Sequence, residues 1–140
     1  DATAVQFMNK IHSNHDVQFV LTSTWKDGLD VDNEMVSHWI KAAFANAGFK
    51  GKFHEIWKTD PYNEADGSYV PDKRAHEVKD FLENHAPGTE DYIIFDDVNF
   101  DFKKVLGKSR FVQTDPQNGL LVKHMLNALS LMGTWEKKNI

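Results

Sequence analysis

The chain has 140 residues, of which 41% are hydrophobic and 26% are charged, a composition typical of one globular domain with a packed core. Its formal net charge of −5 argues against a dedicated binder of long polyanions, because such proteins usually carry a basic face. The sequence contains no Cys, which excludes disulfides and thiolate metal sites, and no apolar run approaches the length needed to span a membrane.

Helices and strands are expected to alternate along the whole chain. Helices are indicated by apolar residues that recur every three to four positions, and strands by short apolar runs between turn residues. The clearest helical stripe lies at 33–48 and predicts that Trp39 and Phe44 belong to the core. The expected elements, in chain order, are a helix at 1–14, a strand at 17–22, a helix at 33–48, a strand at 52–57, a loop at 58–71, a helix at 72–88, a strand at 91–97, a short helix or turn at 99–107, a strand at 109–115 and a helix at 118–132.

This order of elements predicts an α/β fold. Strands that alternate with helices of this length are usually joined by right-handed crossovers, which give a mostly parallel sheet with helices on both faces. No repeat or linker divides the sequence, so residues 1–140 are expected to form a single domain. The strands at 17–22 and 92–97 are apolar at successive positions, which predicts burial on both faces, a central place in the sheet and a shared parallel direction.

Polar residues stand at the carboxyl ends of three expected strands, at 22–24, 96–97 and 113–115. In open sheets of this class, ligands bind beyond the carboxyl ends of the strands. We therefore expect these three strand ends to meet at one site.

The residue types at these positions suggest phosphoryl transfer. Asp96 and Asp97 are adjacent carboxylates, the ligands that a hard cation such as Mg²⁺ prefers. Thr22 offers a hydroxyl donor for a phosphate oxygen, and Lys73 and Arg74 at the start of a helix offer cations that can neutralise phosphate. Metal, hydroxyl and cation together describe a site for phosphoryl transfer.

Each motif also has a purely structural interpretation. The acid pair at 96–97 could end a strand and cap the next helix, and the hydroxyls at 22–24 could be an ordinary strand end. Adjacent basic residues at 73–74 often form a solvated helix start, and Asp101 and Asp115 are expected to be surface caps. The coincidence of the motifs, rather than any one of them, favours a functional site.

The order and spacing of these motifs resemble the haloacid dehalogenase (HAD) superfamily, and most closely the small HAD domains of nucleic-acid repair and phage-type end-healing phosphatases. The stretch "FVLTSTWK" is similar to the second motif of that group, which implies that Thr22 and Ser23 bind phosphate. The stretch "DKRAHEVKDFL" is similar to the third motif, which implies a catalytic, phosphate-binding role for Arg74, with Lys73 as the near alternative.

The resemblance continues to the end of the chain. The stretch "YIIFDDVNFDF" is similar to the fourth motif, which implies that Asp96 and Asp97 hold Mg²⁺, and "RFVQTDPQNGL" resembles the closing strand. The fold implied is a Rossmann-like HAD fold with a minimal cap. Because only residues 25–72 separate the second motif from the third, no large cap fits between them, and an open site would admit a polymer end as readily as a small molecule.

The first motif of the family is missing from the sequence. In the family it is an apolar strand that ends in Asp-x-Asp, in which the first Asp is the nucleophile and the second is the acid/base. Asp1 is preceded by no apolar run and followed by a helical pattern. The family fold places this strand between those of motifs two and four. We therefore expect either that a segment outside these 140 residues supplies the strand, or that the chain is a degenerate relative.

Two functions follow as hypotheses. The first is a Mg²⁺-dependent phosphatase acting on a nucleotide or a nucleic-acid phosphate end, in which the intact protein is an enzyme but the 140-residue chain alone is inactive. The second is a catalytically inactive HAD-like binding or regulatory module. A receiver-type domain also binds Mg²⁺ with paired acids, but those acids lie near its N-terminus. The expected location is the cytoplasm, that of the host if the protein is phage-encoded, with no membrane partner.

Overall fold

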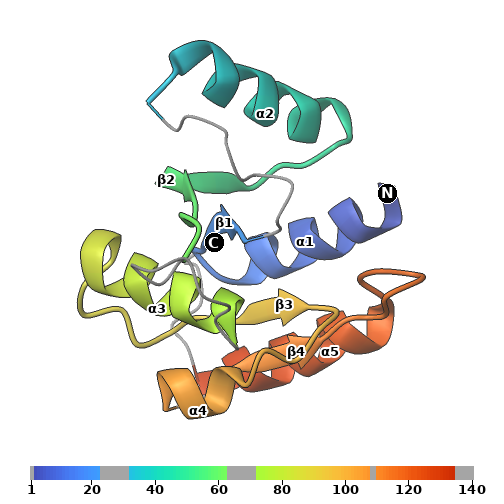
Figure 1. The fold of residues 1–140 in the computed structure, drawn as a ribbon. Coiled ribbons are helices and arrows are strands. Elements are labelled where there is room, and N and C mark those ends of the chain that lie inside the picture. Colours follow the sequence, from blue (N-terminus) through green and yellow to red (C-terminus); the bar gives the residue numbers. More distant parts are fainter. Residues whose placement is uncertain (1, 23–31, 63–71, 108–109, 135–140) are drawn as a thin grey trace.

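The computed structural model describes residues 2–22, 32–62, 72–107 and 110–134. Helices and strands alternate along this part of the chain, which confirms the predicted α/β class (Figure 1). The elements are α1 (Ala2–Asn14), β1 (Gln18–Leu21), α2 (Glu34–Asn46), β2 (Lys52–Lys58), α3 (Lys73–His85), β3 (Ile94–Asp96), α4 (Phe102–Leu106), β4 (Phe111–Gln113), α5 (Val122–Leu131) and the short 3-10 helix η2 (Met132–Thr134).

The four strands form two small parallel sheets. β1 pairs with β2 in one sheet, and β3 pairs with β4 in the other. The parallel direction within each pair agrees with the predicted crossovers. The expectation that 17–22 and 92–97 are central strands is wrong within the described residues, because β1 and β3 each pair on one side only. No described strand lies between them to complete a single sheet.

Helices cover both faces of the sheet formed by β3 and β4. One buried cluster joins α1, β4, α5 and η2, and Phe95 packs against it. A second joins α3, β3 and α4 on the other face, with Ile94 and Phe102 among its members. Because successive side chains of a strand point to opposite faces, Ile94 and Phe95 divide between the two clusters. The short β3 strand is thus fixed by packing on both sides.

The sheet formed by β1 and β2 rests on aromatic packing. Phe19, Phe44, Phe49 and Phe53 meet at ring-centroid distances of 5.0 to 5.8 Å, mostly edge to face. In Figure 1, α2 lies at one end of the molecule, beyond β2. Only one side of α2 contacts the sheet, and Trp39 on its other side is 61% exposed, so the prediction that Trp39 is a core residue is wrong.

Among the described residues, no helix is both long enough and apolar enough to cross a membrane.

Candidate functional site

The carboxyl ends of β1, β3 and β4 meet at one small pocket of about 290 Å³. Thr22 follows β1, Asp96 ends β3, and Thr114 follows β4. The residues that line the pocket are Thr22, Arg74, Phe95, Asp96, Asp97, Thr114, Asp115, Pro116 and Gly119. The predicted meeting of the three strand ends is therefore confirmed, and so is the presence of a basic residue from the start of α3.

Asp96 is the most constrained carboxylate of the pocket. It is only 5% exposed, its Oδ2 accepts a hydrogen bond from Arg74 Nη1 at 2.8 Å, and its Oδ1 accepts one from the Val98 N–H at 3.0 Å. Its backbone carbonyl accepts a further bond from the Thr114 N–H at 2.9 Å. Burial raises the pKa of the Asp96 carboxyl, while the bonds from Arg74 and Val98 hold that pKa down in part.

Arg74 lies in the first turn of α3 and is fixed at two places. Its guanidinium binds Asp96 and stacks over the ring of Phe100, with 4.8 Å from Cζ to the ring centroid. The side chain is 13% exposed, and its buried Nε has no hydrogen-bond partner among the described residues. A buried N–H without a partner is costly, so the guanidinium has a hydrogen-bonding group that its contacts with Asp96 and Phe100 leave unsatisfied.

The other predicted site residues divide into three groups. Thr22 and Asp97 line the pocket, and Asp97 is exposed. Lys73 is the first residue of α3 but is not among the lining residues, so the structure brings Arg74 and not Lys73 to the strand ends. Ser23 lies outside the described residues, and the prediction that it binds phosphate stays open.

Asp115 and Phe100 both contribute to the site but were not among the predicted ligands. Asp115, expected to be a surface cap, does cap the turn that follows β4, because its Oδ1 accepts from the Gln117 and Asn118 N–H groups at 2.8 Å each. The same residue also lines the pocket. The N–H groups of Asn118 and then Gln117 lower the pKa of the Asp115 carboxyl. Its place after a strand was a signal in the sequence, whereas nothing in the sequence indicated that Phe100 would support Arg74.

One protein family has a model that matches residues 1–125, and its description is the HAD domain in Swiss Army Knife RNA repair proteins. The chain belongs to this family. The match confirms the resemblance to the HAD superfamily and to HAD domains of nucleic-acid repair. A search of curated proteins and a search of solved structures each gave no significant match. The protein therefore carries a HAD-type, phosphatase-like domain of the RNA repair kind.

HAD domains generally use Mg²⁺. The pocket of this HAD domain offers ligands of the type that Mg²⁺ prefers. Asp96, Asp97 and the Thr22 hydroxyl all present oxygen, the donor that a hard cation prefers. The number of ligands is small, because the described residues contain no group of three or more acidic or His side chains placed to hold a metal ion. Water or further protein ligands would have to complete an octahedral site.

Proposed function

We propose that this HAD domain is a Mg²⁺-dependent phosphatase domain that acts on the phosphate end of a nucleic acid or on a nucleotide. The proposal extends to a cytoplasmic site of action and to a single domain whose motif-one strand, with its Asp nucleophile, comes from outside residues 1–140. The observation that carries it is the pocket, where a hydroxyl, a fixed guanidinium and two adjacent carboxylates gather at the strand ends of a HAD-family chain.

Each side chain has a chemical role in this proposal. The Arg74 guanidinium, anchored by Asp96 and Phe100, would bind the phosphate through its remaining N–H groups. Thr22 would donate its hydroxyl to another phosphate oxygen. Asp96 and Asp97 would hold Mg²⁺, which neutralises charge on the phosphate when bound. We assign the nucleophile to none of these side chains, because the family mechanism places it on the first Asp of the motif-one strand.

The family description favours RNA ends as the first substrates to test. The experiment compares the 140-residue chain with a longer chain that includes its native upstream codons. Both are assayed with Mg²⁺ or EDTA on RNA and DNA oligonucleotides that carry a 3′- or 5′-phosphate, and on a generic phosphate ester. We expect turnover only from the longer chain and only with Mg²⁺. Robust turnover by the 140-residue chain would contradict an external nucleophile.

Variants of the longer chain test the assigned roles. We expect Arg74→Ala to lower kcat by about 10²- to 10³-fold, the usual effect of removing one preorganised donor from a charged transition state. Lys79→Ala is the matched control, since Lys79 is an exposed cation on the same helix. Full activity in Arg74→Ala would remove Arg74 from the site.

The alternative is a catalytically inactive HAD-like module, favoured by one observation. Asp96 already has its charge balanced by Arg74 and its oxygens bonded without any ion. If the longer chain binds phosphorylated RNA but shows no turnover with any of these substrates, the binding module is the correct function.

A further inference from the structure

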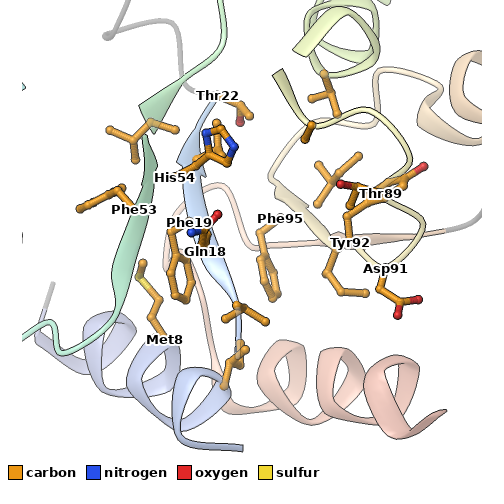
Figure 2. A pocket seen from close by; sticks show the side chains of 18 of the residues that line it. Met8, Gln18, Phe19, Thr22, Phe53, His54, Thr89, Asp91, Tyr92 and Phe95 are labelled. Carbon is orange, nitrogen blue, oxygen red and sulfur yellow. The ribbon is translucent and has the colours of Figure 1, made fainter. Parts of the chain in front are cut away.

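The chain leaves β2 beside the pocket that holds Thr22. Lys58, the last residue of β2, pairs with Leu21 of β1, and the Thr59 N–H donates to the Leu21 carbonyl at 3.0 Å. Figure 2 shows β1 and β2 side by side at the cavity of about 1210 Å³ between the two sheets, with Thr22 at the carboxyl end of β1. The residues that follow β2 therefore begin at the level of the pocket.

An aromatic pair connects this segment to α3. The ring of Tyr62 stacks on the imidazole of His76, with 4.8 Å between the ring centroids and 21° between the ring planes. His76 lies two residues after Arg74, near the start of the helix that brings Arg74 to the pocket. Both residues are half-buried, so part of the pair remains open to solvent. The two rings thus form a nearly parallel aromatic surface beside the proposed phosphate site.

Lys73 lies on the same side of α3 as His76. The two residues are three positions apart, a spacing that makes side chains neighbours on a helix, whereas Arg74 is turned about 100° from Lys73 and binds Asp96. Lys73 is half-buried, and within the described part of the chain its side chain forms no ion pair. A cation next to the pocket but outside it is placed for a second anion rather than for the phosphate in the pocket.

Aromatic rings beside cations are the combination that binds single-stranded nucleic acid, because bases stack on the rings and phosphates pair with the cations. Two acids lie close to this surface. Asp60 pairs with Lys58 Nζ at 3.3 Å, and Asp72 precedes Lys73 at the start of α3. The positive charge is therefore local and small, in keeping with the net charge of −5 of the whole chain. Such a surface suits one nucleotide at the end of an RNA rather than a long polyanion.

We propose that the Tyr62–His76 pair and Lys73 bind the terminal nucleotide of an RNA whose end phosphate occupies the pocket. The base stacks on the aromatic pair, and Lys73 binds the next phosphate along the RNA. This binding mode rests on the proposed function, because the pocket must hold the end phosphate. It narrows the substrate to a polynucleotide end instead of a free nucleotide. Every base has an aromatic face, so we expect little preference among bases.

The experiment measures binding to the 140-residue chain by isothermal titration calorimetry in EDTA, which excludes Mg²⁺-dependent turnover. The probes are inorganic phosphate, adenosine monophosphate, diadenylate with a terminal phosphate, and the same diadenylate without the base next to that phosphate. Each nucleotide is tested in its 5′- and 3′-phosphorylated forms. We expect affinity to rise from phosphate to mononucleotide to diadenylate for one of the two forms. Loss of the base should weaken diadenylate binding about tenfold.

Variants separate the base from the second phosphate. Tyr62→Ala should weaken the binding of diadenylate about tenfold and leave the base-free ligand unchanged, whereas Tyr62→Phe, which keeps the ring, should bind like the parent chain. Trp39→Ala, which removes an exposed aromatic ring from α2, is the control and should have no effect.

The salt dependence of binding tests the role of Lys73. Lys73→Ala should reduce the slope of log affinity against log salt concentration by about 0.7 for diadenylate, because one phosphate contact is lost, and should not change it for the mononucleotide. Lys79→Ala, an exposed cation farther along α3, should leave both slopes unchanged. An unchanged slope for diadenylate in Lys73→Ala would remove Lys73 from the binding surface.

The outcomes distinguish this binding mode from the proposed function. If inorganic phosphate does not bind, or binds equally to Arg74→Ala, the proposed function fails and this binding mode fails with it. If phosphate binding depends on Arg74 but the parent chain binds diadenylate and its base-free form equally, only the binding mode is overturned. Equal losses for both ligands in Tyr62→Ala would also overturn it, because Tyr62 would then act through the fold. If that variant does not fold, the two ligands with the parent chain still decide.

Discussion

At the level of single residues, Arg74 is the best-positioned functional group of the molecule. Asp96 fixes one end of its guanidinium and Phe100 supports its face, so little side-chain freedom remains to be lost when an anion binds. A cation that is already oriented binds phosphate more strongly than a free one, because the entropy of ordering the side chain is lost on folding instead of on binding.

We expect Arg74→Ala to weaken the binding of inorganic phosphate by about tenfold or more, since a charged hydrogen bond contributes about 1.5–3 kcal/mol. Arg74→Lys should recover only part of this, because an ammonium cannot both bind Asp96 and present a planar fork. Lys73→Ala is expected to have a smaller effect, since Lys73 does not line the pocket. Isothermal titration calorimetry measures all three, and equal affinity of Arg74→Ala and the parent chain would show that the third motif is misassigned.

Mg²⁺ is expected to bind the 140-residue chain only weakly, because two carboxylates leave most of an octahedron to water. Asp96→Asn and Asp97→Asn should each reduce the response further, as seen by NMR shifts during a Mg²⁺ titration. Asp101→Asn, which changes an exposed acid outside the pocket, is the control. If Asp96→Asn responds to Mg²⁺ like the parent chain, Asp96 is not a ligand.

Two carboxylates of the pocket should titrate on opposite sides of the ordinary Asp pKa of 3.8. Burial disfavours the charged form of Asp96 and raises its pKa, whereas the N–H groups of Asn118 and Gln117 favour charged Asp115 and lower its pKa. Carboxyl ¹³C NMR in EDTA across pH 2 to 7 measures both midpoints. A midpoint for Asp96 below that of Asp115 would contradict the geometry.

At the level of elements, α2 begins with a local hydrogen-bond signal. The Asn33 Oδ1 accepts from the Met35 and Val36 N–H groups at 3.0 and 3.2 Å, which caps the helix. No residue of α2 is fully buried, so the cap adds to the packing of Phe44 on Phe53 and to the hydrogen bond from Trp57 Nε1 to Ser37 Oγ.

Asn33→Ala should therefore destabilise α2 by about 1 kcal/mol, the usual cost of losing an N-cap. Because α2 is peripheral, we expect this destabilisation to appear as faster amide exchange within 34–46. The urea midpoint of the whole chain should change little. Asn33→Asp, which keeps the capping oxygen, is the control. An unchanged exchange rate in α2, or an equal acceleration throughout the chain, would argue against the cap.

The order and type of the elements were predictable from the sequence because the local signals agree with the fold, whereas β3 and β4 are shorter than the expected 91–97 and 109–115. The helical stripe of α3 and the apolar run of β3 meet in one buried cluster, as their periodicities indicate. Trp39 was misplaced because a stripe shows that a helix is amphipathic but not how wide a contact its neighbour offers. Phe100 was missed because its contact with Arg74 joins residues distant in sequence, and nothing local encodes such a contact.

At the level of the whole molecule, one cluster links the two sheets. Ile11 of α1, the helix that leads into β1, packs with Val112, Ala128 and Met132 of the other half. Because a cavity lies between the two sheets, this cluster is a principal connection between them. Loss of its packing should therefore uncouple the half that contains β1 and β2 from the half that contains β3 and β4.

Ile11→Ala is expected to lower the free energy of unfolding by about 2–5 kcal/mol, the usual range for truncating a buried aliphatic side chain. Met35→Ala, at an exposed position on α2, should stay within about 0.5 kcal/mol. Urea unfolding followed by tryptophan fluorescence measures both. Equal effects of the two substitutions would show that the cluster does not join the halves.

The three hydrogen bonds of Asp96 have a consequence for how relatives of this chain are interpreted. Its backbone joins β3 to the exit of β4, one side-chain oxygen orders the turn at Val98, and the other anchors α3 through Arg74. Replacing its side chain would disturb the turn and the helix at once, whatever the chemistry of the pocket. An Asp at this place in another HAD domain would therefore be kept by selection for folding even after catalysis was lost. Its presence in a relative is evidence for the fold before it is evidence for enzymatic activity.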